Sequence, residues 1–248
     1  MPAMPTYRAL DPDKVIDTIR VLQQRISERF PGAGLGGVCA ELLVIARENS
    51  SRAEKISGRN VPLRVGIFVL LLAGAVGLAW IVSLFYRYPL SAENVYTVLQ
   101  GLEAGANLLV LMGAGIFFLF RIEERLKRRA ALKALHELRS IVHVIDMHQL
   151  TKDPGSVVSI AGKTASSPAR TLSRIEVARY LDYCSEMLSL TSKVAVLFAQ
   201  GFPEPTVTEA VSDIERISAG LSQKIWQKII ILEALGPEVR QSAVGSRQ

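Results

Sequence analysis

The stretch Val65–Tyr86, VGIFVLLLAGAVGLAWIVSLFY, decides the class of this protein, because its 22 residues include no charged side chain. A helix of roughly 20 apolar residues can cross a hydrocarbon layer about 30 Å thick. A second stretch, Ala104–Phe120 (AGANLLVLMGAGIFFLF), contains 17 residues without a charge. We therefore predict two transmembrane helices, over 63–86 and 101–120, that form a hairpin through a short extracytoplasmic loop at 87–100.

The composition of the 248-residue chain agrees with this interpretation. Hydrophobic residues make up 49% of the chain and charged residues 21%, and the mean hydropathy is +0.27. These values exclude an ordinary soluble enzyme and a largely disordered chain. The first 60 residues are polar and charged, without the early apolar segment of a cleavable signal peptide, so we expect the first span to be an uncleaved anchor. The two cysteines are too few for a disulfide framework or a structural zinc site.

The distribution of basic residues predicts the orientation of the spans. Residues 46–64 carry five Lys or Arg and residues 121–139 carry seven, whereas the connector 87–103 carries only Arg87. Basic residues are enriched on the cytoplasmic side of a membrane, so we expect both termini in the cytoplasm. The basic residues that follow the second span are expected to contact anionic lipid headgroups. They are Arg125, Lys127, Arg128, Arg129 and Lys133. Aromatic side chains are not interleaved with this run, so we expect no nucleic-acid partner.

The remaining segments have the apolar spacing of amphipathic helices and no strand pattern. The predicted fold is an all-α membrane protein in which cytoplasmic helical hairpins flank the transmembrane hairpin. The cytoplasmic parts are a helical hairpin over 11–60, a long helix over 121–150 and a second helical hairpin over 171–236. Residues 151–170 are expected to be a linker, and residues 1–10 and 237–248 to be disordered.

Local signals indicate where these helices begin and end. Asp11–Pro12 is typical of a helix start, with Asp as the N-cap and Pro in the first helical position. Ser173-x-x-Glu176 and Thr206-x-x-Glu209 both have the spacing of a capping box. We expect Gly236–Pro237 to end the last helix.

Apolar stripes on the predicted cytoplasmic helices suggest packing against other helices. The stripe within 121–150 has coiled-coil-like spacing over about two heptads, fewer than a coiled coil needs for recognition. The residues expected to carry helix packing are Leu135, Leu138, Val142, Ile145, Ile214, Leu221 and Ile225. No set of residues converges as a catalytic site, so our leading hypothesis is a protein without enzymatic activity or cofactor. Its helices would mediate self-association, or docking of another membrane or cytoplasmic protein.

All three histidines lie within 13 residues, together with one carboxylate. The weak candidates for metal binding are His136, His143, Asp146 and His148. On a helix His143 and Asp146 share a face, whereas His136 lies about 10 Å away along the axis, so the spacing supplies no obvious third ligand. A polar seam between helices explains Arg139, His143 and Asp146 equally well. A metal- or pH-responsive helix therefore remains a third functional hypothesis.

A second hypothesis is a small oligomeric channel or membrane-perturbing effector. Small residues recur in both apolar stretches and allow helix backbones to approach closely. Glu103 and Asn107 lie in the first turns of the second span, where they would line the outer mouth of a ring. Neither span has the regular polar stripe of a wide aqueous pore, which argues against this hypothesis.

Four segments together resemble an uncharacterised family of bacterial two-span membrane proteins. They are RFPGAGL from Arg29, LHELRSIVHVIDMHQLTKDP from Leu135, ARYLDYCSEML from Ala178 and QKIWQKII from Gln223. The resemblance implies a bacterial inner (plasma) membrane protein. It implies no activity, substrate or catalytic residue.

Overall fold

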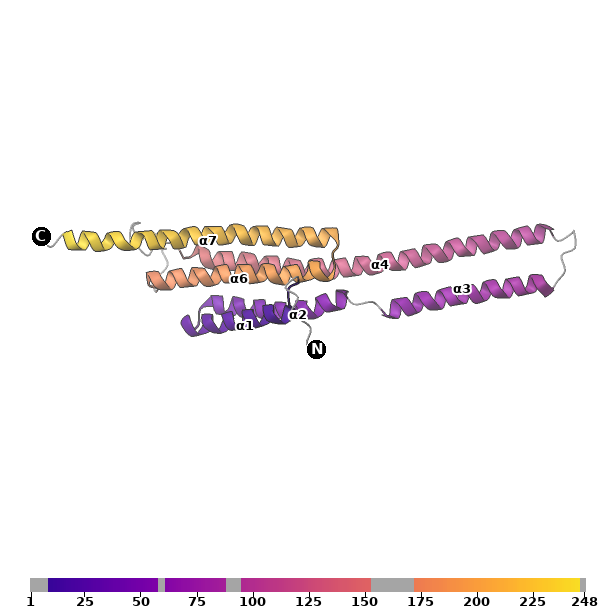
Figure 1. Ribbon diagram of the computed structural model, residues 1–248, viewed down its shortest axis with the longest axis horizontal. Coiled ribbons are helices and arrows are strands. Elements are labelled where there is room, and N and C mark those ends of the chain that lie inside the picture. The colour runs from indigo at the N-terminus through magenta and orange to yellow at the C-terminus, as the bar shows by residue number, and fades with distance from the viewer. Residues whose placement is uncertain (1–8, 58–60, 88–94, 153–171, 246–248) are drawn as a thin grey trace. The chain divides into compact units, whose positions relative to one another are not determined.

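The computed structural model describes residues 9–57, 61–87, 95–152 and 172–245, and within these ranges all regular structure is α-helical, as predicted (Figure 1). The helices are α1 (Pro12–Arg29), α2 (Gly34–Ser57), α3 (Val61–Arg87), α4 (Val95–Leu150), α6 (Arg174–Gly201) and α7 (Pro205–Gly245). The chain divides into two compact units. The bundle unit comprises Met1–Ser57 and Ala130–Gln248, and the apolar unit comprises Gly58–Arg129. Helix α4 contributes residues to both.

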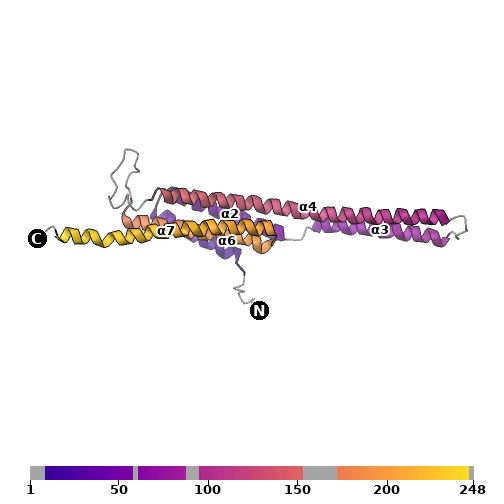
Figure 2. The ribbon, with the colours of Figure 1, turned by 90° about the horizontal axis from the view of Figure 1, so that it is seen from above.

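The bundle unit has one hydrophobic core. Helix α6 packs against α1, α2 and α7, and α1 packs against α2 (Figure 2). Each helix contributes one apolar stripe, such as Ile19 and Ile26 from α1, Leu138 and Ile145 from α4, and Phe198 from α6. Their spacing of three or four residues places the side chains of one stripe on one face of the helix. The apolar stripes predicted from the sequence therefore pack together as the hydrophobic core of the bundle unit.

Two predicted helix starts are confirmed. Asp11 is the N-cap of α1, and its Oδ1 accepts hydrogen bonds from the backbone N–H groups of Asp13 (3.0 Å) and Lys14 (3.4 Å). Ser173 and Glu176 form a complete capping box at the start of α6. The Glu176 backbone N–H donates to Ser173 Oγ (3.3 Å), and the Ser173 backbone N–H donates to Glu176 Oε2 (2.7 Å). These bonds satisfy backbone donors that lack a helical partner.

The predicted capping box at Thr206-x-x-Glu209 is wrong. Helix α7 begins at Pro205, and the side chain of Glu204 accepts the backbone N–H of Val207 at 3.0 Å. The Thr206 hydroxyl donates to Glu204 Oε1 at 3.2 Å. Proline fits the first helical position because its missing N–H would have no partner there. Pro205 therefore starts the helix before Thr206, and Glu204 caps it.

Two predicted boundaries also differ from the structure. Helix α7 continues to Gly245, so the predicted helix end at Gly236–Pro237 and the disordered tail over 237–245 are wrong. Pro237 therefore lies inside α7, and residues 238–244 contain no glycine or further proline. The predicted loop at 87–100 is too long, because α3 includes Arg87 and α4 begins at Val95. The sequence 95–100, VYTVLQ, contains no glycine or proline that would stop the helix from starting early.

Helices α1 and α2 lie within the predicted hairpin segment over 11–60, and α3 covers the predicted segment 63–86. Gly32, with φ +76°, adopts the left-handed conformation in the turn between α1 and α2, where glycine is favoured. The two predicted helices over 101–120 and 121–150 belong to the single helix α4. The expectations for residues 1–8, 88–94, 153–170 and 246–248 lie outside the described residues.

The apolar unit contains the candidate membrane-spanning segments. Among the described residues, one helix is long and apolar enough to cross a membrane, the part of α4 from Leu99 onward. Helix α3 contributes a shorter apolar stretch, Val65–Gly77. The two helices approach closely at one point, because a Cβ placed on Gly74 would lie 2.5 Å from Cε of Met112. A larger residue at Gly74 would therefore displace Met112.

Candidate interaction surfaces

The residues predicted to carry helix packing are all buried in the core of the bundle unit. None of the seven is more than 8% exposed, from Leu138 and Ile145 in α4 to Leu221 in α7. Their partners are other helices of the same unit. These residues are therefore not available to a second protein unless the bundle unit opens, and a docking surface would have to be formed by other residues, exposed on the bundle unit.

The four candidate metal ligands do not converge. His136 and His143 are exposed on α4. The Asp146 carboxylate accepts a hydrogen bond from Gln149 Nε2 at 2.6 Å, and Nδ1 of the half-buried His148 lies 3.2 Å from the Tyr180 hydroxyl. Within the described ranges no group of three His, Cys, Asp or Glu side chains is close enough to hold a metal ion.

Polar contacts of α4 with α6 and α7 lie at the end of α4, whereas Arg139 and His143 of the predicted polar seam are exposed. The hydroxyl of Tyr180 on α6 contacts Nδ1 of His148, and the centre of the Tyr180 ring lies 4.9 Å from Lys152 Nζ. Gln149, which is buried, accepts two hydrogen bonds from Lys228 Nζ of α7, at its backbone oxygen (3.0 Å) and at Oε1 (2.7 Å). Burial, and secondarily the charge of Lys152, lowers the pKa of His148. Neutral His148 is therefore part of the folded arrangement.

Both cysteines are free thiols, and both are buried in the bundle unit. Burial raises the pKa of Cys39 to about 12 and that of Cys184 to about 12. The thiolate is the nucleophilic form of cysteine, and these groups remain protonated at neutral pH. Neither thiol is positioned for nucleophilic catalysis.

The predicted lipid-contacting residues follow the apolar part of α4 along the same helix. Arg125, Arg129 and Lys133 are exposed, whereas Lys127 and Arg128 are half-buried. Lys127 pairs with Glu123 at 2.8 Å, one helical turn earlier. Arg125, Arg129 and Lys133 are therefore accessible to solvent on the surface of α4.

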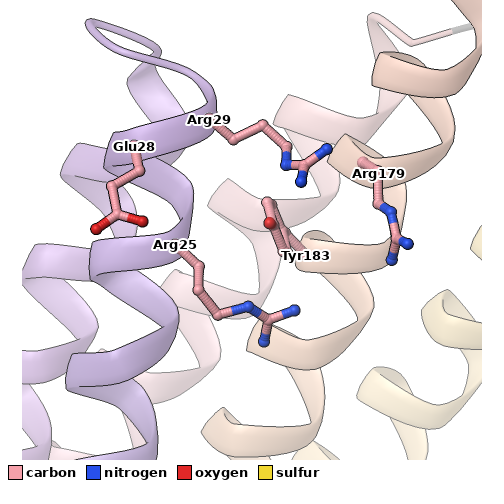
Figure 3. A pocket seen from close by; sticks show the side chains of 5 residues that line it. All are labelled: Arg25, Glu28, Arg29, Arg179 and Tyr183. Carbon is pink, nitrogen blue, oxygen red and sulfur yellow. The ribbon is translucent and has the colours of Figure 1, made fainter.

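A pocket of about 420 Å³ lies between α1 and α6 and is lined by arginine side chains. Figure 3 shows Arg25 and Arg29 extending from α1, and Arg179 and Tyr183 from α6. Arg25 forms two hydrogen bonds with the Glu186 carboxylate (2.8 and 3.2 Å), which raise its pKa, and its guanidinium lies 5.1 Å from the Tyr183 ring centre. Arg179 pairs with Asp182 at 3.4 Å, so two of the three arginines that line this pocket have a carboxylate partner, and the bond between Arg25 and Glu186 links α1 to α6.

A second cavity, of about 400 Å³, lies between α6 and α7 and has a different character. We call it the Trp226 groove; it is lined by Arg174, Ile175, Ala178, Arg179, Asp182, Trp226, Ile229, Leu232 and Glu233. Trp226 is 54% exposed and Ile175 is 68% exposed, and Ile230, one helical turn after Trp226, is 60% exposed. An apolar patch with a polar rim is typical of a protein interaction site.

The sequence carries a local signal for this groove in two neighbouring apolar stripes of α7. In QKIWQKII, Ile225 and Ile229 form one stripe, and Trp226 and Ile230 form a second stripe beside it. The first stripe is buried and the second is exposed. Comparison with known protein families, characterised proteins and solved structures finds no match to this chain.

Proposed function

We propose that this chain is a bacterial inner-membrane protein without enzymatic activity, which carries a cytoplasmic helical bundle that docks a protein. The apolar unit supplies the anchor and the bundle unit supplies the docking surface. The observation that carries the docking function is the groove between α6 and α7, where Trp226 (54% exposed) and Ile175 (68% exposed) present apolar surface beside the buried core of the bundle unit.

The membrane anchor is supported by exposed apolar side chains in the apolar unit. In α4, Leu102, Val110 and Phe118 are each more than 60% exposed, and in α3 Phe68 and Trp80 are as well. Removing apolar surface from water stabilises a protein by about 25 cal/mol per Å². A bilayer would cover these side chains, so we infer that both α3 and the apolar part of α4 cross the membrane.

The orientation is supported by the basic residues at both ends of this pair of helices. Four Lys or Arg precede α3 within residues 46–60 and Arg64 lies near the start of α3, and seven Lys or Arg follow the apolar part of α4 within residues 121–139. Both ends therefore belong on the cytoplasmic side, and residues 88–94 on the opposite side. The exposed Arg125, Arg129 and Lys133 would then bind anionic lipid headgroups.

The anchor and its orientation can be tested by labelling single cysteines in intact cells. A membrane-impermeant maleimide should label Ser91→Cys from outside, and should label Ser140→Cys on the exposed face of α4 only after lysis. The unmodified chain is the matched control, because Cys39 and Cys184 are buried. Labelling of Ser140→Cys in intact cells would refute the orientation, and release of the protein by alkaline carbonate would refute the anchor.

The docking function can be tested with a photo-crosslinking residue at Ile230 in living cells. We expect one discrete crosslinked product, containing either another protein or a second copy of this chain. Ile230 lies on the same face of α7 as Trp226, one helical turn later, and the control position is Lys224, which is exposed but projects from the opposite side of α7. Equal, diffuse crosslinking at both positions would show that the groove is not a docking surface.

A further inference from the structure

We propose that the pocket between α1 and α6 binds a phosphate group, which belongs either to a small soluble phosphate monoester or to a lipid headgroup. We call this cavity the arginine pocket; it is lined by Arg25, Glu28, Arg29, Arg179 and Tyr183. The inference is independent of the proposed docking function, because the arginine pocket and the Trp226 groove are different cavities that share only Arg179.

Arg29 brings a cation without a bound carboxylate to the arginine pocket. Within the described ranges its guanidinium forms no hydrogen bond or ion pair, and Figure 3 shows it extending from the end of α1 toward α6. The acid that senses its charge is Glu176, whose pKa is lowered first by hydrogen bonds with Ser173 and then by Arg29. The Glu176 carboxylate already caps α6, so the N–H donors of Arg29 are left for a ligand.

The other two arginines keep donors that their carboxylates do not use. A guanidinium group has five N–H donors. Arg25 uses two in its bonds to Glu186, and Arg179 uses one in its bond to Asp182. Neither carboxylate is among the residues that line the arginine pocket. The side chains of Arg25 and Arg179 are 44% and 53% exposed, so a ligand that enters from solvent can reach the remaining donors.

The acid that lines the arginine pocket is turned away from the arginines. Glu28 Oε1 accepts a hydrogen bond from Gln24 Nε2 of the same helix at 2.8 Å. Figure 3 shows its carboxylate directed away from the three guanidinium groups. Because the other two arginines are paired, the charge that faces the cavity is the positive charge of Arg29. An anion is therefore attracted to the arginine pocket and a metal cation is repelled.

Tyr183 and its neighbours hold the arginine pocket in place before a ligand arrives. The Tyr183 side chain is buried, and its ring lies edge-on to Phe30 with 6.2 Å between the ring centres. The guanidinium of Arg25 lies 5.1 Å from the centre of the Tyr183 ring, and its two bonds to Glu186 fix it against α6. A site that is already ordered loses less entropy on binding.

The arrangement of donors fits phosphate better than carboxylate. A carboxylate is planar and pairs with the fork of one guanidinium, as Glu186 does with Arg25. A phosphate group is tetrahedral, so its oxygens accept hydrogen bonds from several directions, and here the guanidinium groups come from two helices (Figure 3). The volume of about 420 Å³ lies within the range of roughly 300–1,000 Å³ that is typical of small-ligand sites. It leaves space for an organic group attached to the phosphate.

The test measures binding of inorganic phosphate and glycerol 3-phosphate to the full chain in uncharged detergent micelles, by isothermal titration calorimetry. We expect saturable binding of a phosphate in the wild type and at least tenfold weaker binding in Arg29→Gln, because a hydrogen bond to a charged group is worth roughly tenfold or more in affinity. Arg179→Gln should also weaken binding. Arg29 and Arg179 are both exposed, so the helical circular dichroism should stay at the wild-type level in both variants.

The matched control is Arg20→Gln, which removes the same charge from α1 at an exposed residue outside the arginine pocket and should leave binding unchanged. Hydrogen exchange of peptides from the end of α1 and the start of α6 identifies the source of the phosphate. Glycerol 3-phosphate should slow this exchange if the ligand is soluble, whereas only phosphatidic acid added to the micelles should slow it if the ligand is a lipid. In either case the protection should be lost in Arg29→Gln.

Three results would overturn the inference. The first is that neither source of phosphate slows exchange at the end of α1 and the start of α6. The second is that the wild type and Arg29→Gln bind phosphate equally well. The third is that free glutamate, which offers only carboxylates, binds as tightly as the phosphates. Each of these results would leave the docking function standing, because crosslinking at Ile230 reports on the Trp226 groove.

Discussion

Replacing Gly34 by Ala tests whether the end of α4 is held against the start of α2. A Cβ on Gly34 would lie 2.7 Å from Cε1 of His148, whereas a Cβ on Gly37, three residues later in the same helix, meets no atom within 4 Å. Carbon atoms in contact are normally about 3.5–4.0 Å apart, so the His148 ring has to move by about 1 Å. Gly37→Ala is therefore the matched control.

The magnitude follows from what His148 loses by moving. Its Nδ1 lies 3.2 Å from the Tyr180 hydroxyl, at the long end of hydrogen-bond distances, so a shift of about 1 Å breaks this bond. A hydrogen bond contributes about 0.5–1.5 kcal/mol to the free energy of unfolding. Gly37→Ala instead gains up to about 1 kcal/mol of helix propensity. We expect the two variants to differ by about 1–2 kcal/mol, with Gly34→Ala the less stable.

Native-state hydrogen exchange of the full chain in detergent micelles is the appropriate assay, because peptides from α2 and α6 report on the bundle unit alone. In a His148→Ala background the obstacle is gone, so Gly34→Ala should no longer be destabilising. This double-mutant cycle isolates the contact between the two residues. Equal exchange in Gly34→Ala and Gly37→Ala, or a penalty for Gly34→Ala that persists without His148, would refute the reasoning.

Three further predictions concern the same unit. The pKa of His148 is lowered in the folded state, so neutral His148 contributes fully to the free energy of unfolding above its unfolded pKa near 6.5. The free energy of unfolding should fall as the pH drops below that value. Denaturant titrations of His148→Gln should show a weaker dependence of this free energy on pH. Leu138→Ala removes a buried side chain and should lower the free energy of unfolding by about 2–5 kcal/mol, which thermal unfolding would show as a lower midpoint. Leu150→Ala, at an exposed site, should lower it by less than about 0.5 kcal/mol. Ser173→Ala removes the N-cap of α6 and should lower the free energy of unfolding by about 1 kcal/mol. Because the cap acts locally, faster hydrogen exchange should be confined to the first turn of α6.

Sequence reasoning predicted the helices well because helix formation depends on neighbouring residues. The spacing of Val15, Ile19, Leu22 and Ile26 defines the buried face of α1 without knowledge of the rest of the chain. The N-cap at Asp11 is equally local. The wrong prediction for the start of α7 also had a local cause, because Pro205 begins the helix and Glu204 caps it, ahead of the apparent capping box at Thr206.

The candidate sites were harder to predict because their contacts connect distant parts of the chain. Gln149 and Lys228 are 79 residues apart, and Arg25 and Glu186 are 161 residues apart. No spacing rule links such pairs. The histidines show the opposite problem, since proximity in sequence does not place side chains together on a helix. His143 faces outward, while His148, five residues later, contacts Tyr180.

The two buried thiols give the protein an internal reporter of its own opening. Cys39 of α2 and Cys184 of α6 are both 0% exposed, on two helices that pack against each other. An alkylating reagent can reach them only when the bundle unit opens, so the rate of modification counts opening events. No engineered probe is needed, and the same measurement can be made in intact cells with a membrane-permeable reagent. Any ligand, lipid or partner that stabilises the closed bundle would slow the modification of Cys39 and Cys184, and the decrease in that rate would measure its binding.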